Sequence, residues 1–184
     1  MMHLIALIIL TFMINTIAIF DFNKNSEISN WSITDDVVMG GKSSGNFYLN
    51  SDGFGVFEGF VSLENNGGFS SIRYRDDLIK ISNQNMIRIH LKGDGKNYQF
   101  RVKVNASDYY SYIYSFGTTG AWEIIEIPFE ELPPSFRGRK LNLPNFSSTY
   151  IEEIGFLIGN KKNEKFELTL DKIELLQMKS KLNN

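Results

Sequence analysis

Two neighbouring segments, Met-Ile-Arg-Ile-His-Leu-Lys at residues 86–92 and Tyr-Gln-Phe-Arg-Val-Lys-Val-Asn at residues 98–105, decide the fold class of this chain. Apolar and polar side chains alternate in both, and a period of two places the apolar set on one face of an extended strand. The residues between them, Gly-Asp-Gly-Lys-Asn at 93–97, tolerate the positive φ of a tight connection. We therefore predict that the two segments pair as an antiparallel hairpin.

The rest of the chain reads as further short strands separated by turn residues, with no helical stripe longer than two turns. In the last strand the apolar residues change from even-numbered to odd-numbered positions, which predicts a bulge near Asp171. The pattern predicts an all-β fold, a jelly-roll β-sandwich of about ten short antiparallel strands. The further strands are expected at residues 19–22, 47–49, 54–63, 69–74, 109–116, 122–128, 154–158 and 166–175. The connections 76–85, with a single helical turn, and 130–149 are expected to be loops.

The first part of the sequence differs from the rest, because residues 1–20 contain no Asp, Glu, Lys or Arg. We expect residues 1–18 to be a signal peptide cleaved after Thr-Ile-Ala, with an uncleaved apolar membrane anchor or a buried first strand as alternatives. Residues 19–177 are expected to form a single β-sandwich domain, and residues 178–184 a frayed tail. The expected location is therefore outside the cell or in the cell envelope, with membrane contact only through the leader.

Composition excludes several classes of function. The chain has 184 residues with 19 basic and 21 acidic side chains, a net charge of -2, so no basic stripe suggests a nucleic acid partner. It has no cysteine and two histidines, His3 in the leader and His90 on the polar parity of a strand. The chain therefore has too few cysteines and histidines for catalysis by these residues or for a histidine-rich metal site. We expect no cofactor, no catalytic residue and no enzymatic activity.

Carboxylates are the remaining residues that could carry chemistry. Neighbouring carboxylates in an extended segment point to opposite faces, so the Asp and Glu doublets of this chain do not favour an enzyme with a paired acid and base. A calcium site built from loop oxygens of Asp35, Asp36 or Asp94 stays open, because hard cations need only oxygen ligands.

Two segments with a glycine pair, residues 31–43 and 64–73, are predicted to be loops, and two interpretations of their glycines stay open. In one interpretation the glycines only make tight turns, Met39 and Phe69 close the end of the sandwich, and Arg73 pairs with a carboxylate. In the other, the glycines let a ligand or partner approach the backbone closely. The residues expected at such a binding site are Asp36, Met39, Gly40, Gly41, Ser43, Asn66, Gly67, Gly68, Phe69 and Arg73.

These two segments closely resemble the signature motifs of the complex I intermediate-associated protein 30 family. A Trp, here Trp31, precedes an Asp-x-Val-Met-Gly-Gly-x-Ser stretch at 36–43 and an Asn-Gly-Gly-Phe-x-Ser-x-Arg stretch at 66–73. The similarity covers nearly everything from Phe20 to Leu176. It continues through Lys92–Gly95, Tyr98, Trp122, Ile127–Phe129, Phe136–Gly138, Ile154–Phe156 and Phe166–Leu168.

The resemblance implies a non-enzymatic jelly-roll sandwich similar to galactose-binding domains and carbohydrate-binding modules. The best-known members of the family assist assembly of the respiratory NADH:ubiquinone oxidoreductase in mitochondria. We therefore expect a binding or assembly module that contacts a protein partner or a complex under assembly through the two glycine segments. A cell-envelope carbohydrate-binding module is the alternative, because the aromatic residues Tyr109, Tyr110, Tyr112 and Tyr114 could stack on sugar rings.

Overall fold

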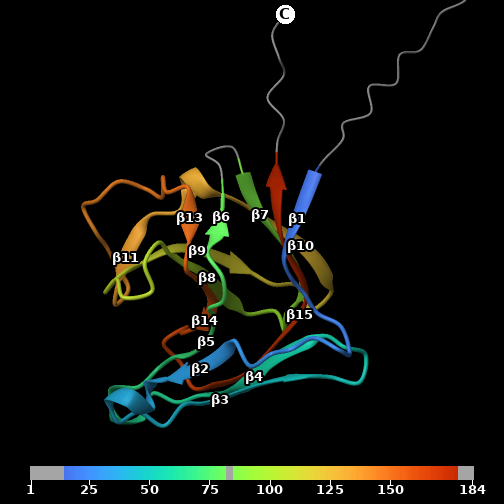
Figure 1. Cartoon of the computed structure of the whole chain (residues 1–184). Helices are drawn as coiled ribbons and strands as arrows, with labels where there is room; N and C mark the ends of the chain where they lie inside the picture. Colours follow the sequence, from blue (N-terminus) through green and yellow to red (C-terminus); the bar gives the residue numbers. More distant parts are fainter. Residues whose placement is uncertain (1–14, 82–84, 178–184) are drawn as a thin grey trace, which may run out of the picture.

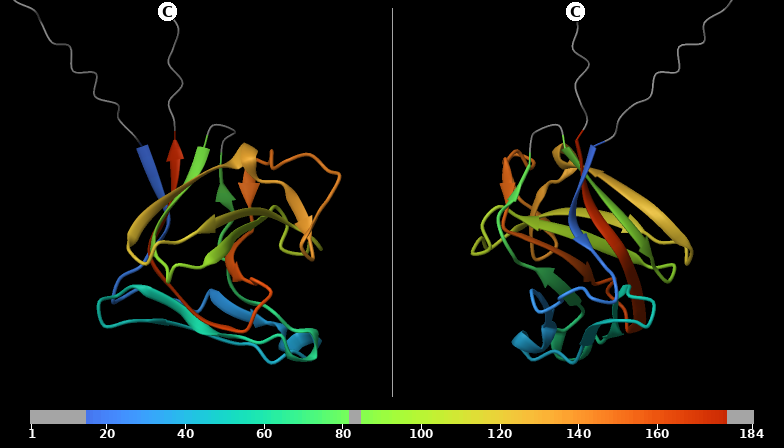
Figure 2. Two further views of the ribbon diagram at one scale, coloured as in Figure 1. Left: turned by 180° about the vertical axis from the view of Figure 1, so that it is seen from behind. Right: turned by 45° about the vertical axis from the view of Figure 1, so that its right-hand side comes forward.

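The structure is a computed structural model that describes residues 15–81 and 85–177, and it shows two antiparallel sheets packed face to face (Figures 1 and 2). Sheet A has the strand order β10–β7–β15–β4–β3, and β1 pairs with β15 beside it. Its strands are β1 (Asn15–Asp21), β3 (Ser44–Leu49), β4 (Gly55–Val61), β7 (Asn85–Lys92), β10 (Trp122–Pro128) and β15 (Glu164–Gln177).

Sheet B has the order β12–β11–β9–β8–β14–β5–β2. A two-stranded ribbon of β6 and β13 and three short 3₁₀ turns complete the described part of the chain. The strands of sheet B are β2 (Trp31–Asp35), β5 (Ser70–Tyr74), β8 (Asn97–Lys103), β9 (Ser111–Gly117), β11 (Pro134–Phe136), β12 (Arg139–Lys140) and β14 (Glu153–Ile158). The remaining elements are β6 (Ile79–Lys80), β13 (Tyr150–Ile151), η1 (Asp36–Met39), η2 (Glu64–Asn66) and η3 (Phe129–Glu131). The predicted all-β jelly-roll sandwich is therefore confirmed.

The long strand β15 organises sheet A. β7 pairs along one of its edges, whereas β4 pairs with its first half and β1 with its second half on the other edge. The β15–β7 register shifts between Leu170 and Lys172, which confirms the bulge predicted near Asp171. A bulge increases the local twist of a strand, so one strand can serve two successive neighbours on the same edge.

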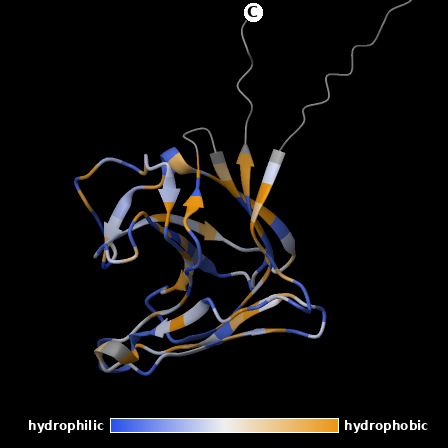
Figure 3. Cartoon of the chain, in the orientation of Figure 1, coloured by the Kyte–Doolittle hydropathy of each residue, from blue (hydrophilic) through white to orange (hydrophobic). Residues whose placement is uncertain are grey.

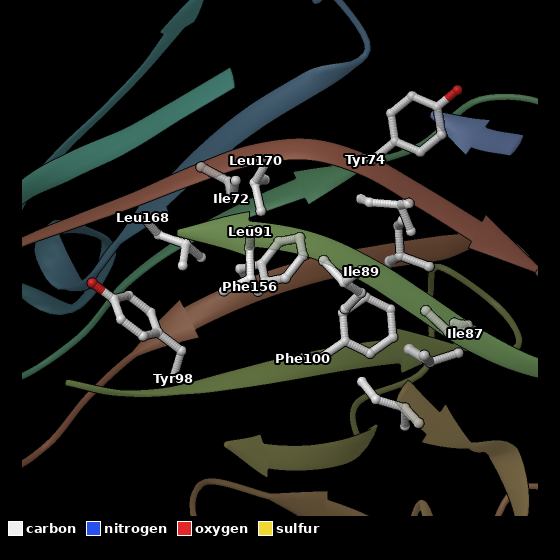
Figure 4. Close-up of a cluster of buried hydrophobic side chains, with 14 of the residues drawn as sticks. Ile72, Tyr74, Ile87, Ile89, Leu91, Tyr98, Phe100, Phe156, Leu168 and Leu170 are labelled. Atoms are coloured by element: carbon white, nitrogen blue, oxygen red, sulfur yellow. The ribbon is translucent and has the colours of Figure 1, made fainter. Parts of the chain in front are cut away.

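Hydrophilic and hydrophobic residues alternate along the strands of both sheets (Figure 3). The apolar faces meet in one core, in which Ile87, Ile89 and Leu91 of β7 lie opposite Phe100 of β8 and Phe156 of β14 (Figure 4). All five of these side chains are fully buried. The two segments that decided the fold class therefore supply the facing halves of the core.

The predicted hairpin between these segments is wrong. β7 forms its hydrogen bonds with β10 and β15 in sheet A, and β8 forms its own with β9 and β14 in sheet B. The connection at 93–96 carries the chain from one sheet to the other, and a Cβ at Gly93 would lie 2.4 Å from Thr118. A period of two only states which face is apolar; it does not distinguish strands that pair edge to edge from strands that stack face to face.

Residues 31–35, predicted to be part of a loop, form the strand β2 at the edge of sheet B. Trp31 is buried there, with its ring centroid 5.1 Å from those of Phe47 and Tyr74. The predicted loop 130–149 contains β11 and β12, and it buries Leu132 and Phe146. In the described part of the other predicted connection, residues 76–81 and 85, the chain forms β6 and no helical turn. These segments show little alternation, so their strands did not stand out.

The predicted leader lies mostly outside the described residues, and so does the predicted tail at 178–184. The last four leader residues, 15–18, form the first half of β1, in which Asn15 pairs with Gln177 and Ala18 with Glu174. Among the described residues there is no helix of sufficient length and apolar character to span a bilayer.

The face-to-face packing of the sheets predicts how much stability is lost when a core side chain is truncated. We expect Phe100→Ala to lower the free energy of unfolding by about 3–5 kcal/mol, because it leaves a cavity between two rigid sheets. Phe136→Ala removes a ring that is 37% exposed, and we expect a loss of less than about 1 kcal/mol there. Urea denaturation of the two variants checks this prediction, and similar losses would contradict it.

Candidate functional site

The carboxylate of Asp36 joins the two glycine segments. Asp36 begins η1 directly after β2 and has no solvent exposure. Its Oδ1 accepts a hydrogen bond from the Ser43 amide at 2.9 Å, and its Oδ2 accepts one from the Ser43 hydroxyl. The same Oδ2 accepts hydrogen bonds from the amides of Gly68 at 2.5 Å and Phe69 at 3.2 Å. One buried side chain therefore connects loops 32 residues apart in the sequence.

The glycines of both motifs make room for this carboxylate. A Cβ at position 41 would lie 2.2 Å from Oδ1 of Asp36, and one at position 67 would lie 2.6 Å from Oδ2. Gly40 ends η1 with φ 88°, a conformation in which a side chain is strained. The space above the Gly41 and Gly67 backbones is thus filled by Asp36 itself, so a ligand does not approach there.

Further hydrogen bonds fix the same loops. The Ser43 hydroxyl accepts a hydrogen bond from the Ser62 amide at 2.9 Å, which ties the first segment to the end of β4. The Asn65 side-chain amide donates to the Gly40 carbonyl at 3.1 Å, which ties η2 to the end of η1. Together with Asp36, these bonds form one network that we call the Asp36 network.

The hydrogen bonds also determine the charge state of Asp36. Burial raises the pKa of this carboxyl, but the hydrogen bonds from the Ser43 hydroxyl and from the Gly68, Ser43 and Phe69 amides lower it by more. Its pKa therefore lies below the ordinary value, and the ionised form is the one that the fold stabilises.

Three apolar side chains project from the loops that the network holds. Val37 is 59%, Met39 55% and Leu63 41% exposed. We call these three residues the apolar tip; the loops that carry them lie side by side at one end of the molecule (Figure 1). The interpretation that Met39 closes the end of the sandwich is wrong, because its side chain is exposed.

The structure divides the residues that the sequence proposed for binding. Five of them take part in the hydrogen bonds of the network: Asp36, Gly40, Ser43, Gly68 and Phe69. Gly41 and Gly67 make room for the Asp36 carboxylate, and Met39 and Asn66 lie at the surface beside the network. Arg73 lies outside the network, on the outer face of sheet B.

The carboxylates considered for calcium do not come together as one ligand set. Asp35 accepts hydrogen bonds from the Gly45 amide and the Ser70 hydroxyl, whereas Asp94 accepts them from Tyr98 and from the Glu167 amide. The described part of the chain holds no group of three or more His, Cys, Asp or Glu side chains that could bind a metal ion.

Sequence reasoning did not identify an aromatic groove on the outer side of sheet A. Phe54 and Trp122 lie with ring centroids 4.8 Å apart, and Trp122 is 48% exposed. They line a groove of about 450 Å³ together with Ile124, His90 and Asp171. His90 was interpreted as an exposed sheet residue; it is half-buried, with Nδ1 3.8 Å from Oδ2 of Asp171. Only the strand order β10–β7–β15–β4 could have revealed this groove.

The tyrosine cluster considered for sugar stacking is mostly packed against the protein. Tyr112 and Tyr114 pack on the core, and Tyr110 contacts Tyr112 with ring centroids 5.6 Å apart. Tyr109 is the exposed member and lies edge-on to Phe136. The cluster therefore does not form an open stacking platform.

The Asp36 network predicts both a loss of stability and a pH dependence. Asp36→Asn places an amide donor among four donors, so we expect it to lower the free energy of unfolding by about 3 kcal/mol at pH 7. Because the folded pKa is lowered, the stabilisation by Asp36 is complete above the unfolded pKa and is lost as the pH falls below about 4. Urea midpoints between pH 7 and pH 3 measure both effects.

Asp52→Asn is the matched control, because Asp52 is exposed in the turn between β3 and β4. It should retain the stability of the wild type and its acid dependence, whereas Asp36→Asn should show a flatter acid profile. Equal profiles for the wild type and Asp36→Asn would show that Asp36 does not hold the loops as an ionised group.

Solved structures similar to this chain are carbohydrate-binding modules and parts of glycoside-cleaving enzymes. The family 11 carbohydrate-binding module of a cellulosomal cellulase of Clostridium thermocellum has a TM-score of 0.66 and 18% identity, over 92% of this chain and 99% of that one. A Clostridium thermocellum family 11 module in complex with a beta-1,3-1,4-mixed-linked tetrasaccharide has a TM-score of 0.61 and 19% identity, over 87% and 94%. An exo-beta-agarase has a TM-score of 0.57 and 11% identity, over 91% of this chain and 26% of that one.

At these identities the likeness shows the fold alone, which is the jelly-roll sandwich of carbohydrate-binding modules. No curated protein sequence matches the chain. The family model described as Complex I intermediate-associated protein 30 matches residues 20–170, a range that contains the Asp36 network and both glycine segments. The chain therefore belongs to the Complex I intermediate-associated protein 30 family.

Proposed function

We propose that this protein is a non-catalytic binding module that contacts a protein partner through the apolar tip and assists assembly of a membrane complex of the respiratory type. The observation that carries the proposal is the exposure of Val37, Met39 and Leu63 on loops fixed by a buried network. Exposed apolar groups gathered at one place are typical of sites that bind proteins. Family membership supports the assembly role.

The Asp36 network makes the tip suitable for binding. Loops that are ordered before binding lose less conformational entropy when a partner docks. Burying each tip side chain in an interface would contribute roughly 1.5–3 kcal/mol. Three such side chains on a rigid support suit a small interface whose strength comes from a few central contacts.

The polar groups of the domain support recognition without catalysis. Each of the three buried carboxylates among the described residues already has a structural partner: Asp36 accepts hydrogen bonds from two loops, Glu153 pairs with Arg75, and Glu164 pairs with Lys162. His90 lines the groove of sheet A, whereas Glu153 lies on sheet B. The leader at residues 1–18 motivates a location in the cell envelope, where such a module would meet membrane proteins.

The tip predicts which variants lose the partner. We expect Val37→Asp combined with Met39→Asp to abolish recovery of the partner when the tagged protein is purified from membranes of its native host. Both side chains are exposed, so the melting temperature should stay within a few degrees. Recovery is measured by quantitative mass spectrometry of the co-purified subunits.

Leu143→Asp is the matched control, because Leu143 is 46% exposed and lies outside the tip. It should retain the same partner as the wild type. If the tip variant recovers the partner as well as the control does, the tip is not the contact surface. If the partner contains no subunit of a respiratory-type complex, the assembly role is wrong even where the tip binds.

A second candidate function is carbohydrate binding by the aromatic groove of sheet A. Trp122 offers an exposed ring face next to Phe54, and Asp171 and His90 offer hydrogen-bonding groups at the same groove. Sugar rings stack on aromatic side chains through their apolar faces, while carboxylates accept hydrogen bonds from their hydroxyls. The likeness of the fold to carbohydrate-binding modules motivates this alternative.

Carbohydrate binding predicts a measurable role for Trp122. We expect isothermal titration calorimetry with a mixed-linked beta-1,3-1,4-glucan tetrasaccharide to show binding that weakens at least about tenfold in Trp122→Ala, through loss of ring stacking. Phe136→Ala, which removes an exposed ring from sheet B, should bind like the wild type. Absence of heat at millimolar protein and ligand concentrations would remove this alternative for neutral beta-glucans.

A further inference from the structure

Two arginines lie on either side of Gly155 on the outer face of sheet B. Gly155 of β14 pairs with Arg73 of β5 on one side and with Arg101 of β8 on the other. A Cβ at position 155 would lie 2.4 Å from the carbonyl oxygen of Ile72, so the place between the arginines stays free of a side chain. Both arginines line a small cavity of about 20 Å³ there, which is room for one oxygen atom or one water molecule.

The other charged groups of this cavity already have partners. Glu153 forms an ion pair with Arg75 at 2.5 Å. The Lys103 ammonium donates to the carbonyl oxygens of Ala106 at 3.2 Å and Asp108 at 2.5 Å. Within residues 15–81 and 85–177, Arg73 and Arg101 form no ion pair. The cavity therefore holds two guanidinium groups without a carboxylate partner.

This arrangement costs free energy in the absence of an anion. Burial and the neighbouring charge of Arg73 lower the pKa of Arg101 to about 10, although Glu153 acts in the opposite direction. Two like charges held near each other in a half-buried site repel more strongly than they would in water. A bound carboxylate would relieve this repulsion, and guanidinium groups match its two oxygens geometrically.

A larger groove, lined only by uncharged residues, lies further along the same strands β8, β9 and β14. It measures about 390 Å³, within the range of small-ligand pockets, and its polar lining includes Asn97, Gln99, Ser115 and Asn160. Gln99 connects the two places, because its Oε1 accepts a hydrogen bond from Arg101 Nε at 3.2 Å. Amides and hydroxyls without charge suit the hydroxyl groups of a sugar ring.

We propose that the outer face of sheet B binds an acidic sugar, with its carboxylate on Arg73 and Arg101 and its hydroxyls in the groove beside Gln99. The groove has no cationic side chain, so it favours a sugar with one carboxylate over an acidic peptide, whose further carboxylates would find no cationic partner there. The site lies on a different sheet from the aromatic groove and does not include the apolar tip. The proposal therefore does not depend on the protein-binding function.

Titration calorimetry of the full chain at low salt tests the site with trigalacturonate and triglucuronate as probes, neutral galactotriose as the uncharged comparison and hexaglutamate as the peptide comparison. We expect one of the uronate trimers to bind at least about tenfold more tightly than galactotriose and hexaglutamate. Arg73→Gln and Arg101→Gln should each weaken that binding at least about tenfold. Arg88→Gln, which removes an arginine from the other sheet, should bind like the wild type.

Several results would overturn the proposal: no uronate binding at about 10 mM ligand, equal binding of galactotriose, tighter binding of hexaglutamate, or an equal loss in Arg88→Gln. The arginine variants are checked for an unchanged circular dichroism spectrum and melting temperature, because both side chains lie outside the core. If Arg73→Gln still recovers the protein partner, the uronate site and the apolar tip are separate sites. If the tip variants also recover the partner, the tip proposal is wrong, but the uronate result is unaffected.

Discussion

The buried carboxylate of Asp36 accepts four hydrogen bonds from two loops, and the shape of one end of the sandwich depends on them. A carboxylate without water is stable only when its oxygens are well supplied with donors, so the two loops must bring their amides to the same point. That requirement explains why positions 41 and 67 are glycine, because any side chain there would overlap the carboxylate. The spacing of the two motifs therefore reflects the hydrogen-bond geometry around one buried carboxylate.

This constraint changes the meaning of the family motifs. Residues such as Asp36 and Ser43 look like ligand contacts in the sequence, since polar groups beside glycine pairs are common in binding loops. In the structure their polar atoms form hydrogen bonds within the protein. The residues that are exposed for contact are the apolar neighbours Val37 and Met39. A motif can therefore mark the frame of a surface instead of the surface itself.

The alternation of apolar residues predicted the fold class, the buried faces of residues 86–92 and 98–105 and the bulge near Asp171, because burial on one face imposes a period of two wherever two sheets stack. It could not predict the partners of β7 and β8, since pairing depends on residues far along the chain. The position of Gly155 between Arg73 and Arg101 and the contact between the rings of Phe54 and Trp122 both follow from the strand order. Sites built across strands stay hidden in a sequence until the strand order is known.

The central position of β15 has a consequence for biosynthesis. β7, β4 and β1 each pair with this strand along one edge, and it is the last strand of the domain to leave the ribosome. Until it arrives, three strands present unpaired edges, and such edges recruit other chains into aggregates. Folding of this sandwich is therefore expected to be completed only after β15 has left the ribosome, with chaperones shielding the earlier strands during translation.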